Sequence, residues 1–139
     1  MTQNDKELLL KDLCARLPYG IKVQVFGWDE EKGEVAVPLK VYSISKDDTD
    51  GYISLEYNHY DVESVYIEDC LLYLRPMSSM TEEEKEEYCN LQDKFLYSSQ
   101  YPVTDAYGLF DWLNAHHFDY RNLIEKNLAL DCTGLHIYD

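Results

Sequence analysis

The stretch LLLKDLCARLPYGIKVQVF, residues 8–26, contains the change of hydrophobic period that decides the fold. Its first half places Leu9, Leu13 and Leu17 at four-residue steps, which predicts an amphipathic helix with its apolar stripe toward a core. The segment Pro18-Tyr19-Gly20 ends that helix. In residues 21–26 apolar and polar residues alternate, which is typical of a half-buried strand. The chain is therefore expected to begin with a helix and to continue into a sheet.

Three further segments, residues 35–41, 52–57 and 62–74, continue the strand pattern and are separated by short polar turns. Pro38 lies inside the first of them and cannot donate a backbone hydrogen bond, so this strand is expected at a sheet edge or at a bulge. Strands that are joined by short turns favour a four-stranded antiparallel meander. Closure into a small SH3-like barrel is one form that such a meander can take.

The pattern becomes helical after residue 76. Thr81 and Glu84 have the spacing of a capping box, so a helix is expected to begin there. A second helix is expected to start at Thr104 or Asp105, and a shorter third helix at Asp119. The apolar residues assigned to the buried sides of the first two helices are Tyr88, Leu91, Phe95, Leu96, Leu109, Phe110, Trp112 and Leu113.

The length of 139 residues is that of one ordinary domain, and the chain has no internal repeat or low-complexity linker. We therefore predict a single α+β domain over residues 1–139. Residues 1–76 are expected to hold the N-terminal helix and the strand-rich part, and residues 77–139 the C-terminal helices.

Acidic residues dominate the charge. The chain has 27 Asp and Glu against 12 Lys and Arg, for a formal net charge of −15. Because binding to nucleic acid or to an anionic membrane needs cations that neutralise phosphates, neither is expected as a direct partner. No apolar run approaches the roughly 18 residues of a membrane span, and residues 1–12 are too charged for a secretory signal.

The cysteines indicate a cytoplasmic protein. Cys14, Cys70, Cys89 and Cys132 contain no Cys-x-x-Cys pair and lie beside or within apolar patterns. A disulfide framework would be expected in a secreted chain. All four cysteines are therefore predicted to be small buried side chains.

Most of the negative charge lies after residue 40. Residues 1–40 hold 7 acids and 6 cations, whereas residues 41–139 hold 20 acids and 6 cations. The dense acidic runs at residues 47–50 and 82–87 would form one acidic face if they lay together, or else an ordinary solvated surface. The chain also has 13 tyrosines, which suit binding interfaces and also pack well on strands. The residues predicted to contact a partner are Asp47, Asp48, Asp50, Glu82, Glu83, Glu86, Glu87, Tyr57, Tyr60, Tyr97 and Tyr101.

Two clusters contain the residue types of a metal or acid–base site. His116, His117 and Asp119 include common ligands and proton carriers, but a helix C-terminus followed by an N-cap explains them better, because adjacent residues on a helix point about 100° apart. Glu56 and His59 have the Glu-x-x-His spacing of di-iron proteins, without the second pair that such a centre requires. No motif of nucleophilic, phosphate-binding or dinucleotide chemistry occurs. The sequence therefore predicts no catalytic residue, no metal ligand and no cofactor.

The helix pair expected within residues 104–130 has the spacing of a helix-turn-helix motif. Its four acids and two cations give it a net charge of −2, which offers little electrostatic attraction to DNA. DNA recognition by this pair is not expected.

Two segments resemble parts of small uncharacterised proteins encoded by phages, prophages and mobile elements of gut bacteria. These segments are Leu72–Lys85, LYLRPMSSMTEEEK, and Trp112–Lys126, WLNAHHFDYRNLIEK, which together make up about a fifth of the chain. The resemblance implies a setting and supplies no catalytic residue. Asn122 and Asn127 stand where the related chains carry Gly, and Asn tolerates a left-handed backbone better than most residues.

We therefore expect a non-enzymatic intracellular accessory protein of a phage or mobile element, which binds a protein partner through an acidic, tyrosine-rich surface. The partner is expected to present a basic surface. One alternative is a nucleic-acid mimic that inhibits a DNA- or RNA-binding protein, although 40 Å of B-DNA carries about 24 charges and the whole chain has a net 15. A second alternative is a small enzyme that uses His and carboxylate groups. The sequence predicts neither the identity of the partner nor the oligomeric state.

Overall fold

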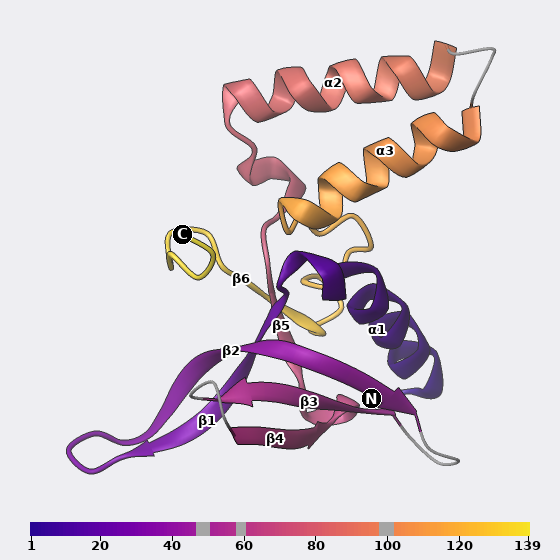
Figure 1. Ribbon diagram of the computed structural model, residues 1–139. Coiled ribbons are helices and arrows are strands. Elements are labelled where there is room, and N and C mark those ends of the chain that lie inside the picture. Colours follow the sequence, from indigo (N-terminus) through magenta and orange to yellow (C-terminus); the bar gives the residue numbers. More distant parts are fainter. Residues whose placement is uncertain (47–50, 58–60, 98–101) are drawn as a thin grey trace.

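The computed structural model describes residues 1–46, 51–57, 61–97 and 102–139 (Figure 1). In these residues, six strands form one sheet in the order β4-β3-β2-β1-β5-β6. The elements in chain order are α1 (Gln3–Arg16), the 3-10 turn η1 (Leu17–Tyr19), β1 (Lys22–Asp29), β2 (Gly33–Lys46), β3 (Gly51–Tyr57), β4 (Asp61–Tyr66), η2 (Ile67–Asp69), β5 (Leu71–Leu74), η3 (Met77–Ser79), α2 (Glu82–Tyr97), α3 (Pro102–Ala115) and β6 (Ala129–Asp131).

Helix α1 and strand β1 confirm the expected change from helix to strand. The Thr2 hydroxyl accepts the Asp5 N–H and the Asp5 carboxylate accepts the Thr2 N–H, both at 3.1 Å, so α1 begins with a capping box. After η1, Gly20 has a φ of 73°, a left-handed conformation that glycine adopts without strain. The chain turns there and enters β1.

Strands β1 to β4 form the expected antiparallel meander. The prediction of one strand over residues 62–74 is wrong, because η2 divides it into β4 and β5. Strand β5 pairs with the opposite side of β1, antiparallel to it, and β6 then joins β5 in parallel. The sheet is therefore mixed and open between its edges β4 and β6, and the SH3-like barrel is wrong. Glu68 and Asp69, two consecutive acids within an apolar run, were the only local sign of the break.

Strand β2 is shared between two pairings. Residues 33–40 lie opposite β1, residues 41–46 lie opposite β3, and the register shifts between Val41 and Ser43. Pro38 lies in the first half of β2 and pairs with Gln24 of β1. In the described sheet, the other side of this half of β2 has no strand beside it. Strand β2 is therefore an interior strand rather than the expected edge strand, but Pro38 lies where one side of β2 is unpaired in the described sheet.

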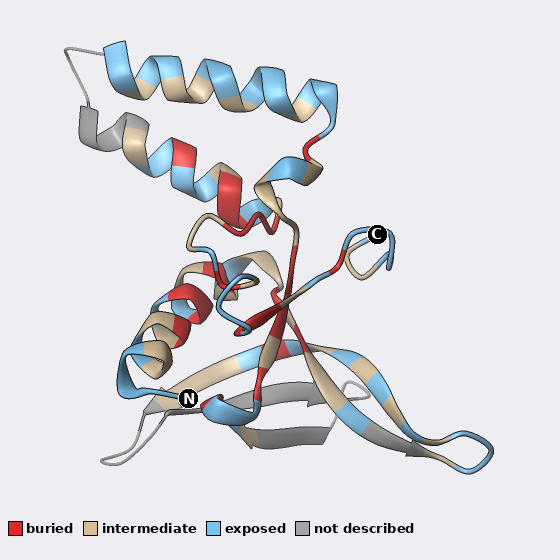
Figure 2. Cartoon of the chain, turned by 180° about the vertical axis from the view of Figure 1, so that it is seen from behind, coloured by how far each residue is buried: buried red, intermediate tan, exposed pale blue. Residues whose placement is uncertain are grey.

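Two separate hydrophobic clusters stabilise the fold. The first lies between α1 and one side of the sheet, and its members Leu9, Leu13 and Leu72 have no exposed surface. The second lies between α2 and α3 and includes Leu113 and Phe118. The helix pair occupies the end of the molecule away from the β3–β4 edge (Figure 1). Buried residues gather in α1, β5, β6 and α3, whereas α2 has none (Figure 2).

The segment after α3 differs from the predicted third helix. Residues 119–127 form bends and turns. The Asp119 carboxylate nevertheless acts as a cap, since it accepts the N–H groups of Leu123 at 2.9 Å and of Ile124 at 3.0 Å. Asn122 and Asn127 both have a φ of 60°, which interrupts a helix and agrees with the expected left-handed backbone.

Several predicted burial assignments are wrong. Helix α2 packs against α3 only on one side, so the apolar stripe is narrower than expected, and Leu96 is exposed. Phe110 of α3 is also exposed. Cys70 and Cys132 are buried as predicted, but Cys14 and Cys89 are exposed, and all four are free thiols.

Among the described residues, no helix has the length and apolar character needed to cross a membrane.

Candidate interaction surface and the adjoining pocket

The start of α2 is fixed by the carboxylate of Glu84. This carboxylate accepts the Thr81 N–H at 2.9 Å and the Thr81 hydroxyl accepts the Glu84 N–H at 3.2 Å, so the predicted capping box is present. Two further hydrogen bonds join it to the guanidinium of Arg75, from Nη1 to Oε2 at 2.8 Å and from Nη2 to Oε1 at 2.7 Å. Chiefly through Arg75, the pKa of Glu84 is lowered to about 2. Glu84 therefore holds α2 to the end of β5.

Four other acids at the start of α2 are exposed and form what we call the acidic face of α2: Glu82, Glu83, Glu86 and Glu87. Glu82 and Glu86, like Glu83 and Glu87, are four residues apart and so lie on the same side of the helix. Glu82 pairs with Lys85 at 3.1 Å. Glu87 accepts the indole N–H of Trp112 at 2.9 Å, which joins α2 to α3. These predicted contact residues are all accessible to a partner.

The predicted tyrosines have different outcomes. Tyr97, the last residue of α2, is 81% exposed and follows the exposed Leu96. Tyr60 and Tyr101, and the side chain of Tyr57, lie outside the described part of the structure. Sequence reasoning missed three exposed tyrosines, Tyr42, Tyr66 and Tyr107. Tyr42 lies next to the buried Val41 within a strand, and this alternation was the available signal.

The described chain gives no support for one continuous acidic face. Asp47, Asp48 and Asp50 lie outside the described residues. The ends of β2 and β3 that flank this run lie at the opposite end of the molecule from α2 (Figures 1 and 2). His59 and the side chain of Glu56 also lie outside the described part of the structure.

His116, His117 and Asp119 do not converge. The Nδ1 atom of His116 lies 2.9 Å from the Trp112 carbonyl, and the His116 ring packs on the Trp112 ring at 4.3 Å. His117 has a φ of 62°, is buried, and stacks on Tyr138 with ring centroids 3.5 Å apart. Asp119 is bonded to the backbone that follows it. No group of three or more His, Cys, Asp or Glu in the described part of the chain could hold a metal ion.

Burial lowers the pKa of His117 to about 4, and the nearby Arg16 guanidinium acts in the same direction. His117 is therefore neutral at pH 7. Its Nδ1 atom, like Nη1 of Arg16, is buried without a hydrogen-bond partner within the described structure.

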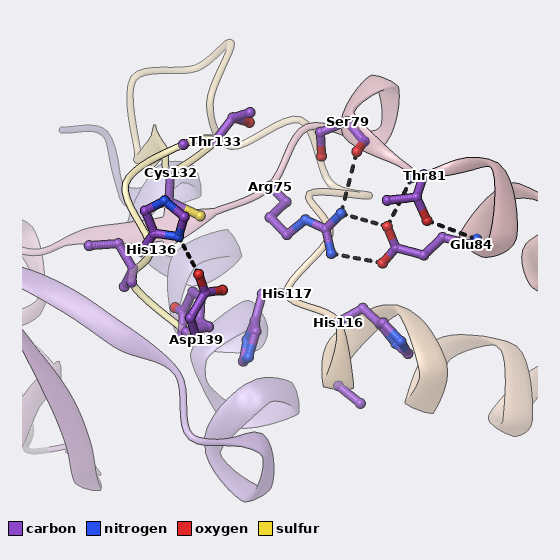
Figure 3. A pocket seen from close by; sticks show the side chains of 14 residues that line it. Arg75, Ser79, Thr81, Glu84, His116, His117, Cys132, Thr133, His136 and Asp139 are labelled. Carbon is purple, nitrogen blue, oxygen red and sulfur yellow. Dashed lines mark hydrogen bonds and ion pairs between the residues drawn. The ribbon is translucent and has the colours of Figure 1, made fainter.

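A cavity of about 580 Å³ lies between the Arg75–Glu84 pair, the end of α3 and the C-terminal residues 132–139 (Figure 3). His116 and His117 line the cavity at the end of α3, and His136 lines it from the C-terminal residues. The polar groups around the cavity mostly bind one another, since His136 bonds to Asp139 and Arg75 to Glu84. Burial raises the pKa of the Cys132 thiol, which makes this thiol a weak nucleophile.

A buried polar network connects α1 to the turns after α3. Arg16 Nε donates to Asp12 Oδ2 at 2.8 Å, and neither residue has exposed surface. Arg16 Nη2 donates to the Phe118 carbonyl at 2.6 Å, and Arg121 Nη1 donates to Asp12 Oδ1 at 2.7 Å. Such bonds offset the cost of removing these charges from water. Asp12 and Arg16 are four residues apart in α1, a spacing typical of exposed ion pairs on a helix, so nothing in the sequence indicated their burial.

No protein-family model, curated protein or solved structure matches this chain. The resemblance of Leu72–Lys85 and Trp112–Lys126 to phage and mobile-element proteins therefore stays a prediction.

Proposed function

We propose that this protein is a non-enzymatic binding protein whose partner contacts the acidic face of α2 together with Leu96 and Tyr97. The observation that carries this proposal is that α2, a helix of 16 residues, contributes no buried residue although it packs against α3. Its outer side holds carboxylates and its C-terminal end holds two exposed apolar side chains. All these groups are accessible without any change in the fold.

The chemistry of α2 suits a partner with a basic surface. Six acids and two lysines lie within α2, and of these acids only Glu84 is held by Arg75. Opposite charges on two proteins accelerate their encounter and fix their orientation. Tyr97 and Leu96 supply apolar contact area, which high salt does not screen. The complex should therefore form faster at low salt and remain partly stable at high salt.

The wider setting that we propose is the cytoplasm of a bacterium that carries a phage or mobile element. The resemblance of the two segments, one of which includes the start of α2, supports this setting. Four free thiols suit a reducing compartment.

Capture of the partner from bacterial lysate by the immobilised full chain tests the proposal. The variant Glu82→Gln/Glu83→Gln/Glu86→Gln removes three charges from the acidic face of α2 and omits Glu87, which Trp112 uses. A control variant, Glu7→Gln/Glu30→Gln/Glu31→Gln, removes the same charge from other exposed positions. We expect the first variant to lose the partner at about 0.1 M salt, where charges within about 10 Å still interact, and the control to retain it. Equal capture by both variants would contradict the proposal.

The same experiment separates this function from the alternatives. If added DNA or RNA releases the captured partner, the protein is a nucleic-acid mimic rather than an ordinary binding protein. The enzyme alternative receives no support from His116, His117 and Asp119, because these three side chains do not converge on one site.

A further inference from the structure

The sheet has one covered side and one partly open side. Helix α1 covers the first side (Figure 1). On the second side the C-terminal segment covers β5, where the Tyr138 hydroxyl donates to the Tyr73 carbonyl at 2.7 Å and Tyr73 is only 4% exposed. Lys22 Nζ bonds to the Ile137 carbonyl at 2.8 Å and extends this cover to the start of β1. The rest of the second side has no such cover over its described residues.

We call this uncovered part the open sheet face. Side chains alternate along a strand, so Ala36, Pro38, Lys40 and Tyr42 of β2 share this side, and all four are exposed. Phe26 of β1, which pairs with Ala36, is 64% exposed, as is Tyr42, and Tyr66 of β4 is 59% exposed. Antiparallel sheets normally present polar residues to water. An exposed surface of aromatic rings, proline and alanine marks a site of association.

We propose that the open sheet face binds the same face of a second copy of this chain. Its charges are self-complementary: Glu34 and Lys40 lie on this side of β2, at equal distances on either side of residue 37. A twofold axis through that position would place Glu34 of each copy opposite Lys40 of the other, with Ala36 and Pro38 between them. The two charges are six residues, or about 20 Å, apart along the strand, which leaves room for an apolar centre between the ion pairs.

The distribution of charge also favours a second copy on this side. The total of −15 opposes self-association, but residues 1–40 hold 7 acids and 6 cations and are nearly neutral. The acidic face of α2 lies at the other end of the molecule (Figure 1). Two copies that meet through the open sheet face therefore do not bring the acidic faces of their α2 helices together.

The available area sets the strength of the dimer. An aromatic side chain buries about 150–250 Å², so three rings that are each about 60% exposed offer roughly 350–400 Å² per copy. With Ala36, Pro38 and Lys40 the interface totals roughly 1,000 Å² over both copies, the low end for a specific complex. We therefore expect a reversible dimer with a dissociation constant of about 10–100 µM.

Sedimentation velocity of the full chain from about 5 to 500 µM tests this inference. We expect a monomer–dimer equilibrium whose dissociation constant changes less than about threefold when salt is raised from about 0.05 to 0.5 M, because salt weakens both the Glu34–Lys40 pairs and the repulsion between the two copies. A complex of a basic partner with α2 should instead weaken clearly over this range, so the two proposals can fail independently. A chain that remains monomeric over this range would overturn the inference.

Matched variants locate the interface. Phe26→Ser/Tyr42→Ser should weaken the dimer at least tenfold, whereas Tyr97→Ser/Tyr107→Ser, which removes similarly exposed rings from α2 and α3, should change it less than twofold. Because all four rings are exposed, folding should persist, and far-UV circular dichroism checks this. Equal effects of the two variants would refute the assigned surface.

A charge exchange tests the twofold arrangement itself. Each of the single variants Glu34→Lys and Lys40→Glu places like charges opposite each other at both symmetry-related positions of the dimer. Each should therefore weaken the dimer severalfold. The double variant Glu34→Lys/Lys40→Glu should recover the original dissociation constant to within about threefold, as expected when two sites interact directly. Additive weakening in the double variant would exclude this geometry.

Discussion

Replacing Glu84 by Gln removes one negative charge from the junction between β5 and α2 and leaves the helix cap in place, since Gln can serve in a capping box. The pKa of Glu84 is lowered from 4.5 to about 2, first of all by the hydrogen bonds from Arg75. Each pKa unit corresponds to about 1.4 kcal/mol, which gives an upper limit of about 3 kcal/mol. The Arg75 and Glu84 side chains are 26% and 15% exposed, and screening by solvent reduces the expected loss to about 2 kcal/mol at pH 7.

The pH dependence follows from the direction of the pKa change. Because the folded state lowers the pKa of Glu84, the stabilisation is fully present above pH 4.5 and is lost as the pH falls toward 2. The difference in the free energy of unfolding between wild type and Glu84→Gln should therefore shrink from about 2 kcal/mol at pH 7 to near zero at about pH 2.

Urea unfolding of wild type and variant between pH 7 and pH 2, followed by tryptophan fluorescence and circular dichroism, measures this difference. Using the difference removes the effect of the other 26 acids, which titrate in both proteins. The control is Glu83→Gln, which removes a neighbouring exposed charge and should change stability by less than about 0.5 kcal/mol. Equal losses in the two variants, or a loss that does not depend on pH, would refute the role given to the Arg75–Glu84 pair.

Three more predictions concern stability and titration. Asp12→Ala leaves the buried Arg16 without its carboxylate and should cost about 3–5 kcal/mol in chemical unfolding, against less than about 0.5 kcal/mol for the exposed Asp93→Ala. Asn127 has a φ of 60°, so Asn127→Ala should cost about 1 kcal/mol while Asn127→Gly leaves the melting temperature unchanged or higher. The ring resonances of His117 should titrate near pH 4 by NMR. Because the folded state favours neutral His117, stability should fall as the pH decreases from about 6.5 toward 4. His117→Asn, which suits the φ of 62°, should lose this contribution.

Local patterns predicted the elements whose structure depends on local forces. The change of period around Gly20 gave the boundary between α1 and β1, and the spacing of Thr81 and Glu84 gave the cap of α2. The break at η2 and the pairing of β5 with β1 and β6 were not predicted. They depend on which distant strand supplies hydrogen bonds, and residues 62–74 have the same apolar pattern whether they form one strand or two.

The contrast between local patterns and distant contacts also decided which site residues could be predicted. The exposure of Glu82, Glu83, Glu86 and Glu87 could be anticipated, because consecutive acids in a helix cannot all be buried without partners. The burial of Arg16 could not be anticipated, because its partners include the Phe118 carbonyl, 102 residues away in the chain. The open sheet face likewise required knowledge of which side of β2 is covered by α1.

The two separate hydrophobic clusters have a consequence for how the protein opens. The contacts that hold the α2–α3 pair to the sheet include the Arg75 guanidinium over the Phe118 ring at 4.3 Å and the Arg75–Glu84 pair. Partial unfolding can therefore separate α2 from α3 while the cluster beneath α1 remains intact, and the chain should consist of two cooperative units of unequal stability. Amide protons of α2 should exchange with solvent through this smaller opening, and those of β1 and β5 only through global unfolding. A partner that binds α2 would then slow exchange selectively in the less stable unit.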